Sequence, residues 1–300
     1  MKRPVLSRCL LLISAFVGFV GFGGKEDSSR DDLLVGGEFA YTVKKGDSLA
    51  SVGARFGVEP RWLALRNQLS PVAGLRVGQV LRVDNRHVIP FLLEAGILIN
   101  IPQRLLFLFR EGRLVSWYPV AVGRRDWPTA AGLFEIQTLE RHPTWDVPVS
   151  IQREMRRLGR SALTRVPPGP ENPLGDYWIG LEGSGCGIHG TNAPTSIYGF
   201  RTHGCIRLHP EDIADLFPRV SRGMPVRIIY EPVLLARGAD GWIFLEVNPD
   251  VYGRQKDRAG TVAALAESAN LQTVIDPAAV QRAVTSQEGL ATRVDLPISP

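Results

Sequence analysis

The sequence has few cysteines, no long apolar run and almost no excess of either charge. Three cysteines among 300 residues exclude a small protein held together by disulfides. The apolar run at residues 10–20 is shorter than the roughly 20 residues that span a bilayer. Setting aside Lys2, Arg3 and Arg8 reduces the 35 basic side chains to 32, against 30 acidic ones. This near balance gives no reason to expect a nucleic acid partner.

Two motif types are also missing. No Gly-x4-Gly-Lys-Ser/Thr loop for a nucleotide phosphate is present, and neither Cys-x2-Cys nor His-Glu-x2-His occurs as a zinc motif. The ligand types for zinc do occur in Cys186, His189, His203 and Cys205, but their spacing is unusual for a zinc site. We therefore expect no cofactor and no bound metal, and keep a zinc site as an alternative.

The first residues have the layout of an export signal. Basic side chains at positions 2, 3 and 8 precede the apolar run, and small residues follow at 21, 23 and 24. We expect residues 1–24 to be a signal peptide, or a short anchor if it is not cleaved. The expected location is the periplasm or cell envelope, where a pair of cysteines commonly forms a disulfide.

A small α/β unit is predicted at 40–84, after a polar linker at 25–39. A short strand at 41–43 is followed by a helix that Asp47 or Ser48 caps and that Gly57 ends. Pro60 suits the first turn of a second helix, and residues 80–83 form a closing strand. The order strand, helix, helix, strand predicts a βααβ module.

The pattern becomes mainly β after a second linker at 85–95. Short apolar runs separated by glycine and proline predict a β-sandwich or barrel at 96–230, interrupted by helices at 151–158 and 210–220. Residues 231–253 are predicted to be a C-terminal extension, and 254–300 a tail to which we assign no role. We expect His87 and His142 at the surface, and the tryptophans at 117, 127, 145 and 178 to pack against other residues.

The chemistry-bearing residues gather between 186 and 208. A thiol is partly ionised near neutral pH, and a nearby imidazole can take its proton, so Cys205 with a histidine forms a nucleophile and base. Gly204 lets the backbone approach a carbonyl closely, which would point its N–H and that of Cys205 at an oxyanion. Arg207 would lie on the same face as Cys205 in an extended strand and can hold a carboxylate.

Two segments resemble known families. The run YTVKKGDSL at 41–49, with Phe56, Asn67, Gly78 and Leu81, resembles a LysM domain, which implies binding to the glycan of peptidoglycan. The motifs HGT at 189–191 and THGCIRL at 202–208 resemble the L,D-transpeptidase catalytic domain, which implies a β-sandwich-like fold. The chain is therefore expected to be α+β and mainly β, with a LysM module ahead of the catalytic domain.

The second resemblance implies a reaction. The cysteine attacks the peptide bond after the L-centre of meso-diaminopimelate in a tetrapeptide stem, D-alanine leaves, and an amine resolves the thioacyl-enzyme. It implies that Cys205 is the nucleophile and His189 the base, with His203 as a further catalytic residue. Gly204 and Thr202 would shape the pocket and oxyanion site. The remaining positions of the motifs, Arg207, Gly190 and Thr191, would bind substrate.

Several alternatives stay open at the level of sequence. The acceptor is either another diaminopimelate or the C-terminal lysine of an outer-membrane lipoprotein, and water would make the protein an L,D-carboxypeptidase. A non-catalytic wall-binding protein is a further alternative. Cys186 lies three residues before His189, where the family does not lead us to expect a cysteine. It is a buried apolar side chain, a disulfide partner that silences Cys205, or a resolving thiol.

Overall fold

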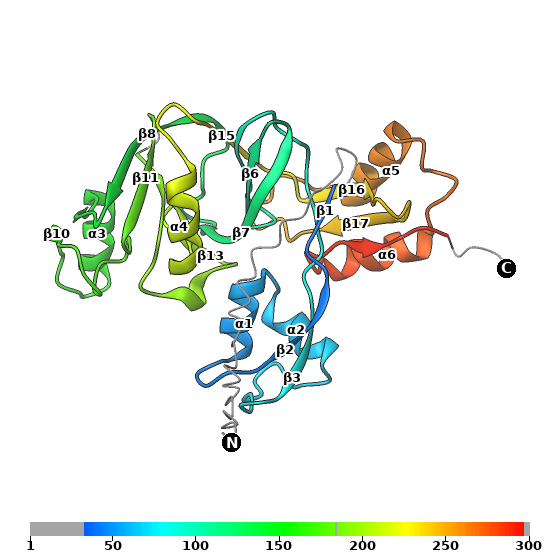
Figure 1. Cartoon of the computed structure of the whole chain (residues 1–300), viewed down its shortest axis with the longest axis horizontal. Helices are drawn as coiled ribbons and strands as arrows, with labels where there is room; N and C mark the ends of the chain where they lie inside the picture. The colour runs from blue at the N-terminus through cyan, green and yellow to red at the C-terminus, as the bar shows by residue number, and fades with distance from the viewer. Residues whose placement is uncertain (1–32, 184, 297–300) are drawn as a thin grey trace, which may run out of the picture.

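The computed structural model describes residues 33–183 and 185–296, which form three packed units (Figure 1). A small module that includes α1 and α2 lies below a β-rich body, and a smaller unit with α5 and α6 lies beside them. The expected signal segment 1–24 is outside the described residues. Within the described ranges, no helix has both the length and the apolar character needed to cross a membrane.

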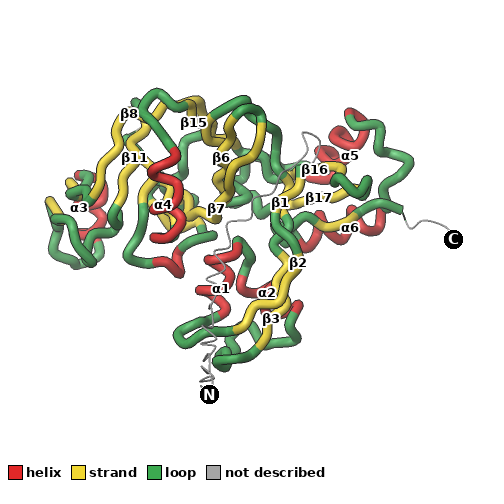
Figure 2. The backbone as a smooth tube through the Cα atoms, in the orientation of Figure 1, coloured by secondary structure: helices red, strands yellow, loops and turns green. Residues whose placement is uncertain are grey.

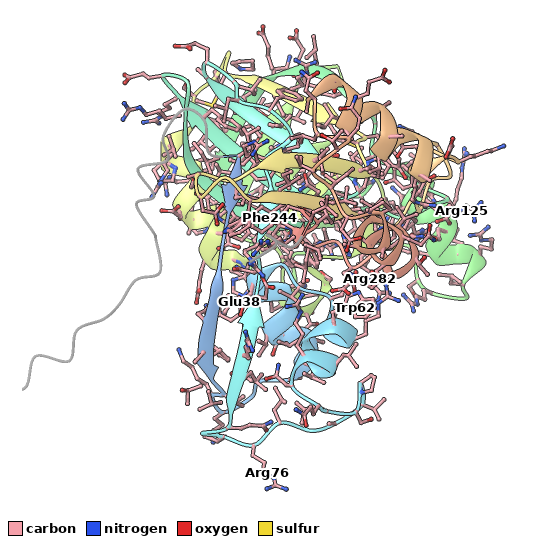
Figure 3. The ribbon with its side chains drawn as sticks, turned by 90° about the vertical axis from the view of Figure 1, so that its right-hand side faces the viewer. Glu38, Trp62, Arg76, Arg125, Phe244 and Arg282 are labelled. Carbon is pink, nitrogen blue, oxygen red and sulfur yellow. The ribbon has the colours of Figure 1, made fainter. Side chains whose placement is uncertain are left out.

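The N-terminal module has the predicted βααβ order. Its elements are β2 (Glu38–Thr42), α1 (Leu49–Phe56), α2 (Pro60–Arg66) and β3 (Val80–Asp84), and β2 pairs antiparallel with β3. Ser48 caps α1 in a capping box with Ser51, and Gly57 ends the helix with a φ of 72°. Figure 3 shows Arg76 at the far end of this module, pointing away from the other two units.

Parts of both predicted linkers are ordered. Strand β1 (Leu34–Val35) in the first linker pairs antiparallel with β4 (His87–Val88) in the second, and both Val35 and Val88 are buried. His87, which we expected at the surface, is fully buried as well. Strands of two residues carry no sequence periodicity, so the pattern of the chain did not indicate this pairing.

The β-rich body contains nine strands in one sheet, together with a short two-stranded pairing and four helical segments. The sheet strands are β5 (Gly96–Asn100), β6 (Leu105–Arg110), β7 (Arg113–Gly123), β8 (Gly132–Arg141), β11 (Tyr177–Leu181), β12 (Gly187–His189), β13 (Phe200–Thr202), β14 (Ile206–Leu208) and β15 (Pro225–Ile229). The other elements are β9 (Trp145–Asp146), α3 (Val149–Arg157), β10 (Arg165–Val166), the 3-10 turns Pro194–Ser196 and Phe217–Arg219, and α4 (Pro210–Leu216).

Strand β7 closes this sheet on itself. Its first half pairs with β6, while Val120 and Ala121 in its second half pair with β14. The two halves of the sheet therefore face one another across a shared core, as in a sandwich, and are joined into one closed sheet. Helix α4 places Ile213 and Leu216 in this core, and Figure 2 shows the helix lying against the strands.

The predicted extension and tail form one unit. Strands β16 (Val233–Arg237), β17 (Ile243–Val247) and β18 (Thr292–Arg293) make a three-stranded antiparallel sheet, against which α5 (Arg258–Ser268) and α6 (Pro277–Ser286) pack. Its core joins strand residues such as Leu245 with Val262 of α5 and Ala283 of α6. Residues 254–296 thus complete the unit that the extension begins, and do not form a separate tail.

A buried carboxylate joins the three units. Both oxygens of Glu246 on β17 accept hydrogen bonds, from the Val88 N–H (2.7 Å), Gln103 Nε2 (3.0 Å) and Asn248 Nδ2 (3.1 Å), and His87 Nδ1 lies 3.2 Å away. His87 Nε2 faces the carbonyl of Gly57 in the N-terminal module at 3.1 Å. A buried carboxylate requires such partners, which here come from the second linker, the β-rich body and the C-terminal unit, and His87 extends the contact to the N-terminal module.

Candidate active site

Two short parallel strands position the predicted catalytic residues. In β12 and β14, Ile188 pairs with Ile206 and His189 pairs with Arg207. Side chains alternate along a strand, so the two isoleucines enter the core while His189 and Arg207 lie on the other face. Cys205 comes directly before β14 and shares the face of Arg207, as the sequence predicted.

This face borders a cavity of about 610 Å³. Five predicted site residues line it, and all come from β12 or from the segment that runs from the end of β13 into β14: His189, Thr202, His203, Cys205 and Arg207. Helix α3 covers another side of the cavity with Ile151, Glu154 and Met155. Cys205 and both candidate bases thus reach one cavity, although 13 residues separate the two histidines.

The environment of His189 keeps its ring neutral. The imidazole is 4% exposed, its ring stacks on Trp178 with centroids 5.9 Å apart, and Nδ1 donates to the carbonyl of Gly190 at 2.7 Å. Burial, followed by the charge of Arg207, lowers the pKa of His189 to about 3, and the carbonyls of Gly190 and Leu174 act in the opposite direction. With the proton of the neutral ring on Nδ1, Nε2 carries no proton.

The sulfur of Cys205 contacts that of Cys186. The two cysteines are not joined by a disulfide, and the Cys205 thiol donates a hydrogen bond to Cys186. This contact, together with burial, raises the pKa of Cys205, while the Gly187 N–H and the charge of Arg207 lower it. A negative charge on one sulfur opposes a second charge on the other, so the two thiols do not ionise together.

His203 reaches the cavity but is held by a carboxylate. Its Nε2 bonds to Glu154 of α3 at 2.5 Å, and its ring meets Trp127 edge to face at 4.9 Å. Arg124 bonds to the other oxygen of Glu154. These two partners, His203 first, lower the pKa of Glu154. No residue of α3 is fully buried, and Glu154 links this helix to the segment that carries Cys205.

We expect Glu154→Gln to loosen α3 over the cavity. The KM for a stem-peptide substrate should rise roughly three- to ten-fold, as for loss of one partly exposed ion pair, while kcat changes less. Trypsin should also cut faster after Arg153 and Arg156. Glu267→Gln on exposed α5 is the matched control. Equal KM and equal cleavage in both variants would contradict this role.

The segment before Cys205 is folded by Thr202. Its hydroxyl donates to the Cys205 carbonyl at 2.5 Å and accepts from the Gly204 N–H at 3.3 Å, and Gly204 has a φ of 107°, which favours glycine. The prediction that the Gly204 N–H would point at an oxyanion is therefore wrong in this structure, because that N–H faces the threonine. Gly204 does not line the cavity.

The C-terminal unit supports the same segment. Thr129 Oγ1 donates to the Gly204 carbonyl at 2.9 Å and accepts from the Gly123 N–H at 2.8 Å. Tyr252 Oη in turn accepts from the Thr129 N–H at 3.0 Å and donates to the Gly123 carbonyl at 2.7 Å. Tyr252, for which the sequence indicated no role, therefore supports the loop that carries Cys205 through Thr129.

Two predicted substrate-binding residues do not reach the cavity. Gly190 presents its carbonyl to His189, and a Cβ at this position would lie 3.2 Å from Ile213 and 3.3 Å from the Leu174 carbonyl. Thr191 is buried and its hydroxyl accepts from the Ala193 N–H at 2.9 Å. Both residues fold the segment behind His189 and do not contact the cavity.

Arg207 does reach the cavity, and its guanidinium is only partly hydrogen-bonded. Its NH1 donates to Ser196 Oγ at 2.9 Å, while its Nε is buried and has no hydrogen-bond partner. Burial lowers the pKa of Arg207, although the guanidinium remains cationic at any ordinary pH. A half-buried cation with no carboxylate partner among the described residues is suited to an anionic ligand.

The zinc alternative finds no support in this arrangement. Among residues 33–183 and 185–296, no group of three or more His, Cys, Asp or Glu side chains is placed to hold a metal ion. His203 is instead hydrogen-bonded to Glu154, and the two thiols share a hydrogen bond.

The sequence reasoning missed several cavity residues. Glu154 is the only acidic residue of an arginine-rich helix, and that isolation was the available signal. Trp127, Trp145 and Trp178 also line the cavity, where they provide apolar walls, whereas we expected them only to pack. Their side chains do pack, but in two of the three cases they pack on the candidate catalytic histidines, Trp178 on His189 and Trp127 on His203.

Comparisons with known proteins identify the same two parts. Residues 94–228 match the L,D-transpeptidase catalytic domain, and residues 41–84 match the LysM domain. The chain is 32% identical over 265 residues to "Probable L,D-transpeptidase ErfK/SrfK" of Salmonella typhimurium, covering 83% of this chain and 81% of the relative. It is 30% identical over 288 residues to "Probable L,D-transpeptidase YbiS" of Escherichia coli, covering 90% of each.

The fold, the cysteine and histidine cavity and these matches define a class of cell-wall acyltransferase. The chain belongs to the L,D-transpeptidase family, with a LysM domain ahead of the catalytic domain. It is thus an enzyme that acts on peptidoglycan stem peptides, with a module that binds peptidoglycan.

Proposed function

We propose that Cys205 is the nucleophile of this transpeptidase. Its sulfur attacks the carbonyl at the L-centre of meso-diaminopimelate in a tetrapeptide stem. The C–N bond to D-alanine breaks, D-alanine leaves as the amine, and a thioester on Cys205 remains. The observation that carries this proposal is that the half-buried Cys205 and the buried His189 line one cavity. A primary amine then attacks the thioester and releases the thiol.

His189 is the base of the proposed reaction. A neutral imidazole whose Nδ1 proton is held by the Gly190 carbonyl can accept the thiol proton at Nε2 and deliver it to the leaving amine. His203 has a supporting role, because its Nε2 is already engaged by Glu154. The oxyanion contact is assigned to the N–H of Cys205 itself, since that of Gly204 faces Thr202.

Arg207 binds a carboxylate of the stem peptide in this proposal. Its unpartnered Nε and its position on the face of Cys205 support that role. Substrate binding would also place a negative charge beside the cation that depresses the pKa of His189. The bound substrate therefore makes the base stronger at the moment when it is needed.

We expect Arg207→Gln to lower kcat/KM for a tetrapeptide substrate roughly 10- to 100-fold, as for loss of a hydrogen bond between charged groups. The same change removes a charge that lowers the pKa of His189, so that pKa should rise. The rate requires neutral His189, and the acidic limb of its pH profile should therefore move to higher pH. Arg222→Gln at an exposed site is the control. An unchanged kcat/KM and limb would contradict the assignment.

The acceptor is proposed to be a primary amine, either of another diaminopimelate or of a lipoprotein C-terminal lysine. Purified protein is incubated with tetrapeptide muropeptides, with and without a peptide that ends in lysine, and the masses of the products are measured by mass spectrometry. A crosslinked dimer identifies diaminopimelate, and a peptide adduct identifies lysine. D-alanine release with bare tripeptide alone would show hydrolysis and contradict amine transfer, as would the absence of D-alanine.

We further propose that the enzyme works outside the cytoplasm, exported through the segment at 1–24. The LysM module and a substrate that lies in the cell wall support this location. A fusion of the whole chain to a reporter that is active only after export tests it. Loss of reporter activity on deletion of residues 2–24 is expected, and unchanged activity would contradict export by this segment.

A further inference from the structure

The two cysteines approach each other where two strand ends meet. Cys186 closes the turn between β11 and β12, where its carbonyl accepts from the Leu181 N–H at 3.1 Å. The pairing of Ile188 with Ile206 places Cys205 beside Gly187, whose N–H bonds to the Cys205 sulfur. Cys186 is therefore one residue along the chain from the direct neighbour of Cys205.

This separation suits a disulfide. Neighbouring strands lie about 4.8 Å apart and successive residues about 3.3 Å, which places the two Cα atoms about 6 Å apart, within the range that disulfides span. The thiols already share a hydrogen bond, and a Cβ built on Gly204 would lie 3.4 Å from Cys186 Sγ.

The pair is also chemically unequal. The hydrogen bond from Cys205 lowers the pKa of Cys186 to about 7, whereas the same contact raises that of Cys205. The shared hydrogen bond thus makes Cys186 the more acidic of the two thiols. A thiol with a pKa near the ambient pH is the most effective attacker in thiol–disulfide exchange. Both sulfurs line the cavity, which gives an oxidant access to them.

We propose that Cys186 is a resolving thiol, which forms a reversible disulfide with Cys205 and so switches off and protects the nucleophile. The proposal rests on the proposed role of Cys205 and concerns the regulation of that site. The co-reactant is a small-molecule or protein disulfide. The Cys186 thiolate attacks it, forming a mixed disulfide and releasing one thiolate. Cys205 then attacks the Cys186 sulfur, and its proton passes to the second thiolate that leaves.

The exchange transfers two electrons from the two cysteines to the external disulfide. One external disulfide is reduced to two thiols, and the two cysteines lose two hydrogens and gain one S–S bond. A dithiol reductant reverses the reaction by the same steps. While the bond exists, Cys205 has no thiolate to attack a stem peptide, and its sulfur is shielded from oxidation to sulfinic acid.

The test counts thiols before it measures activity. The full chain carrying Cys9→Ser, so that two thiols remain, is treated with oxidised glutathione and then with a maleimide. We expect a mass lower by two hydrogens, no maleimide uptake, and a peptide that links 186 with 205. Transpeptidation should fall at least about ten-fold and return after dithiothreitol. In Cys186→Ala the same treatment should leave glutathione attached to Cys205, with Cys186→Ser as the second variant.

Two results would overturn the proposal. One is continued uptake of two maleimides after oxidation, and the other is a stable glutathione adduct on the protein with both cysteines present. Neither readout uses the enzymatic reaction, so the proposed disulfide can fail independently of the proposed catalytic function. A 186–205 linkage in a protein whose reduced form releases no D-alanine would refute the proposed function and leave the disulfide standing.

Discussion

Cys205→Ala should lower the formation of transpeptidation products by at least about 100-fold under reducing conditions. The thioester cannot form without the sulfur, and the described cavity offers no other side chain of comparable nucleophilicity except Cys186. D-alanine release from a tetrapeptide muropeptide, followed by mass spectrometry, measures this loss.

Cys186→Ala is the matched control for that variant. It removes the neighbouring thiol while Cys205 and its contacts with Gly187 and Arg207 remain. We expect it to continue releasing D-alanine in the presence of reductant. The reverse pattern, with Cys205→Ala active and Cys186→Ala inactive, would show that Cys186 is the nucleophile and would contradict our assignment.

His189→Ala should cost a similar factor of at least about 100, because nucleophile and base act as a unit. For the same reason the double variant Cys205→Ala/His189→Ala should be no worse than either single one. In the unaltered enzyme, a His189 pKa of about 3 predicts that the acidic limb of kcat/KM from this group lies well below the range of an ordinary histidine. Measuring the rate between pH 3 and 8 tests this.

His142→Asn is the control for the histidine variant. His142 is exposed and has a φ of 47°, a conformation that asparagine tolerates. Its activity should be unchanged. A His189→Ala enzyme that keeps half its rate would overturn the assignment of the base, and His203 with Glu154 would then be the pair to test.

Local patterns predicted the local structure well. Ser48 and Gly57 bound α1 as expected, and Pro210 begins α4, because caps and first-turn prolines act within a few residues of the chain. The common face of Cys205 and Arg207 likewise follows from strand alternation alone. The family motifs then indicated which side chains would meet in one cavity, which no local pattern specifies.

The features that sequence reasoning missed depend on contacts between distant segments. The burial of His87 depends on Glu246, which lies 159 residues away. The brace of Thr129 by Tyr252 and the hold of Glu154 on His203 likewise join separate elements. Gly204 illustrates the same limit at short range, because its N–H direction depends on how Thr202 turns the chain.

The central claim is that the acyl group passes through the sulfur of Cys205, and trapping that intermediate tests it most directly. The enzyme is mixed with a tetrapeptide muropeptide without added amine, quenched in acid within seconds, and its intact mass and peptides are measured. We predict an adduct of the substrate minus D-alanine on the peptide that contains Cys205, cleaved by hydroxylamine as a thioester. An adduct on another residue, or steady D-alanine release with no adduct at any time, would contradict the account.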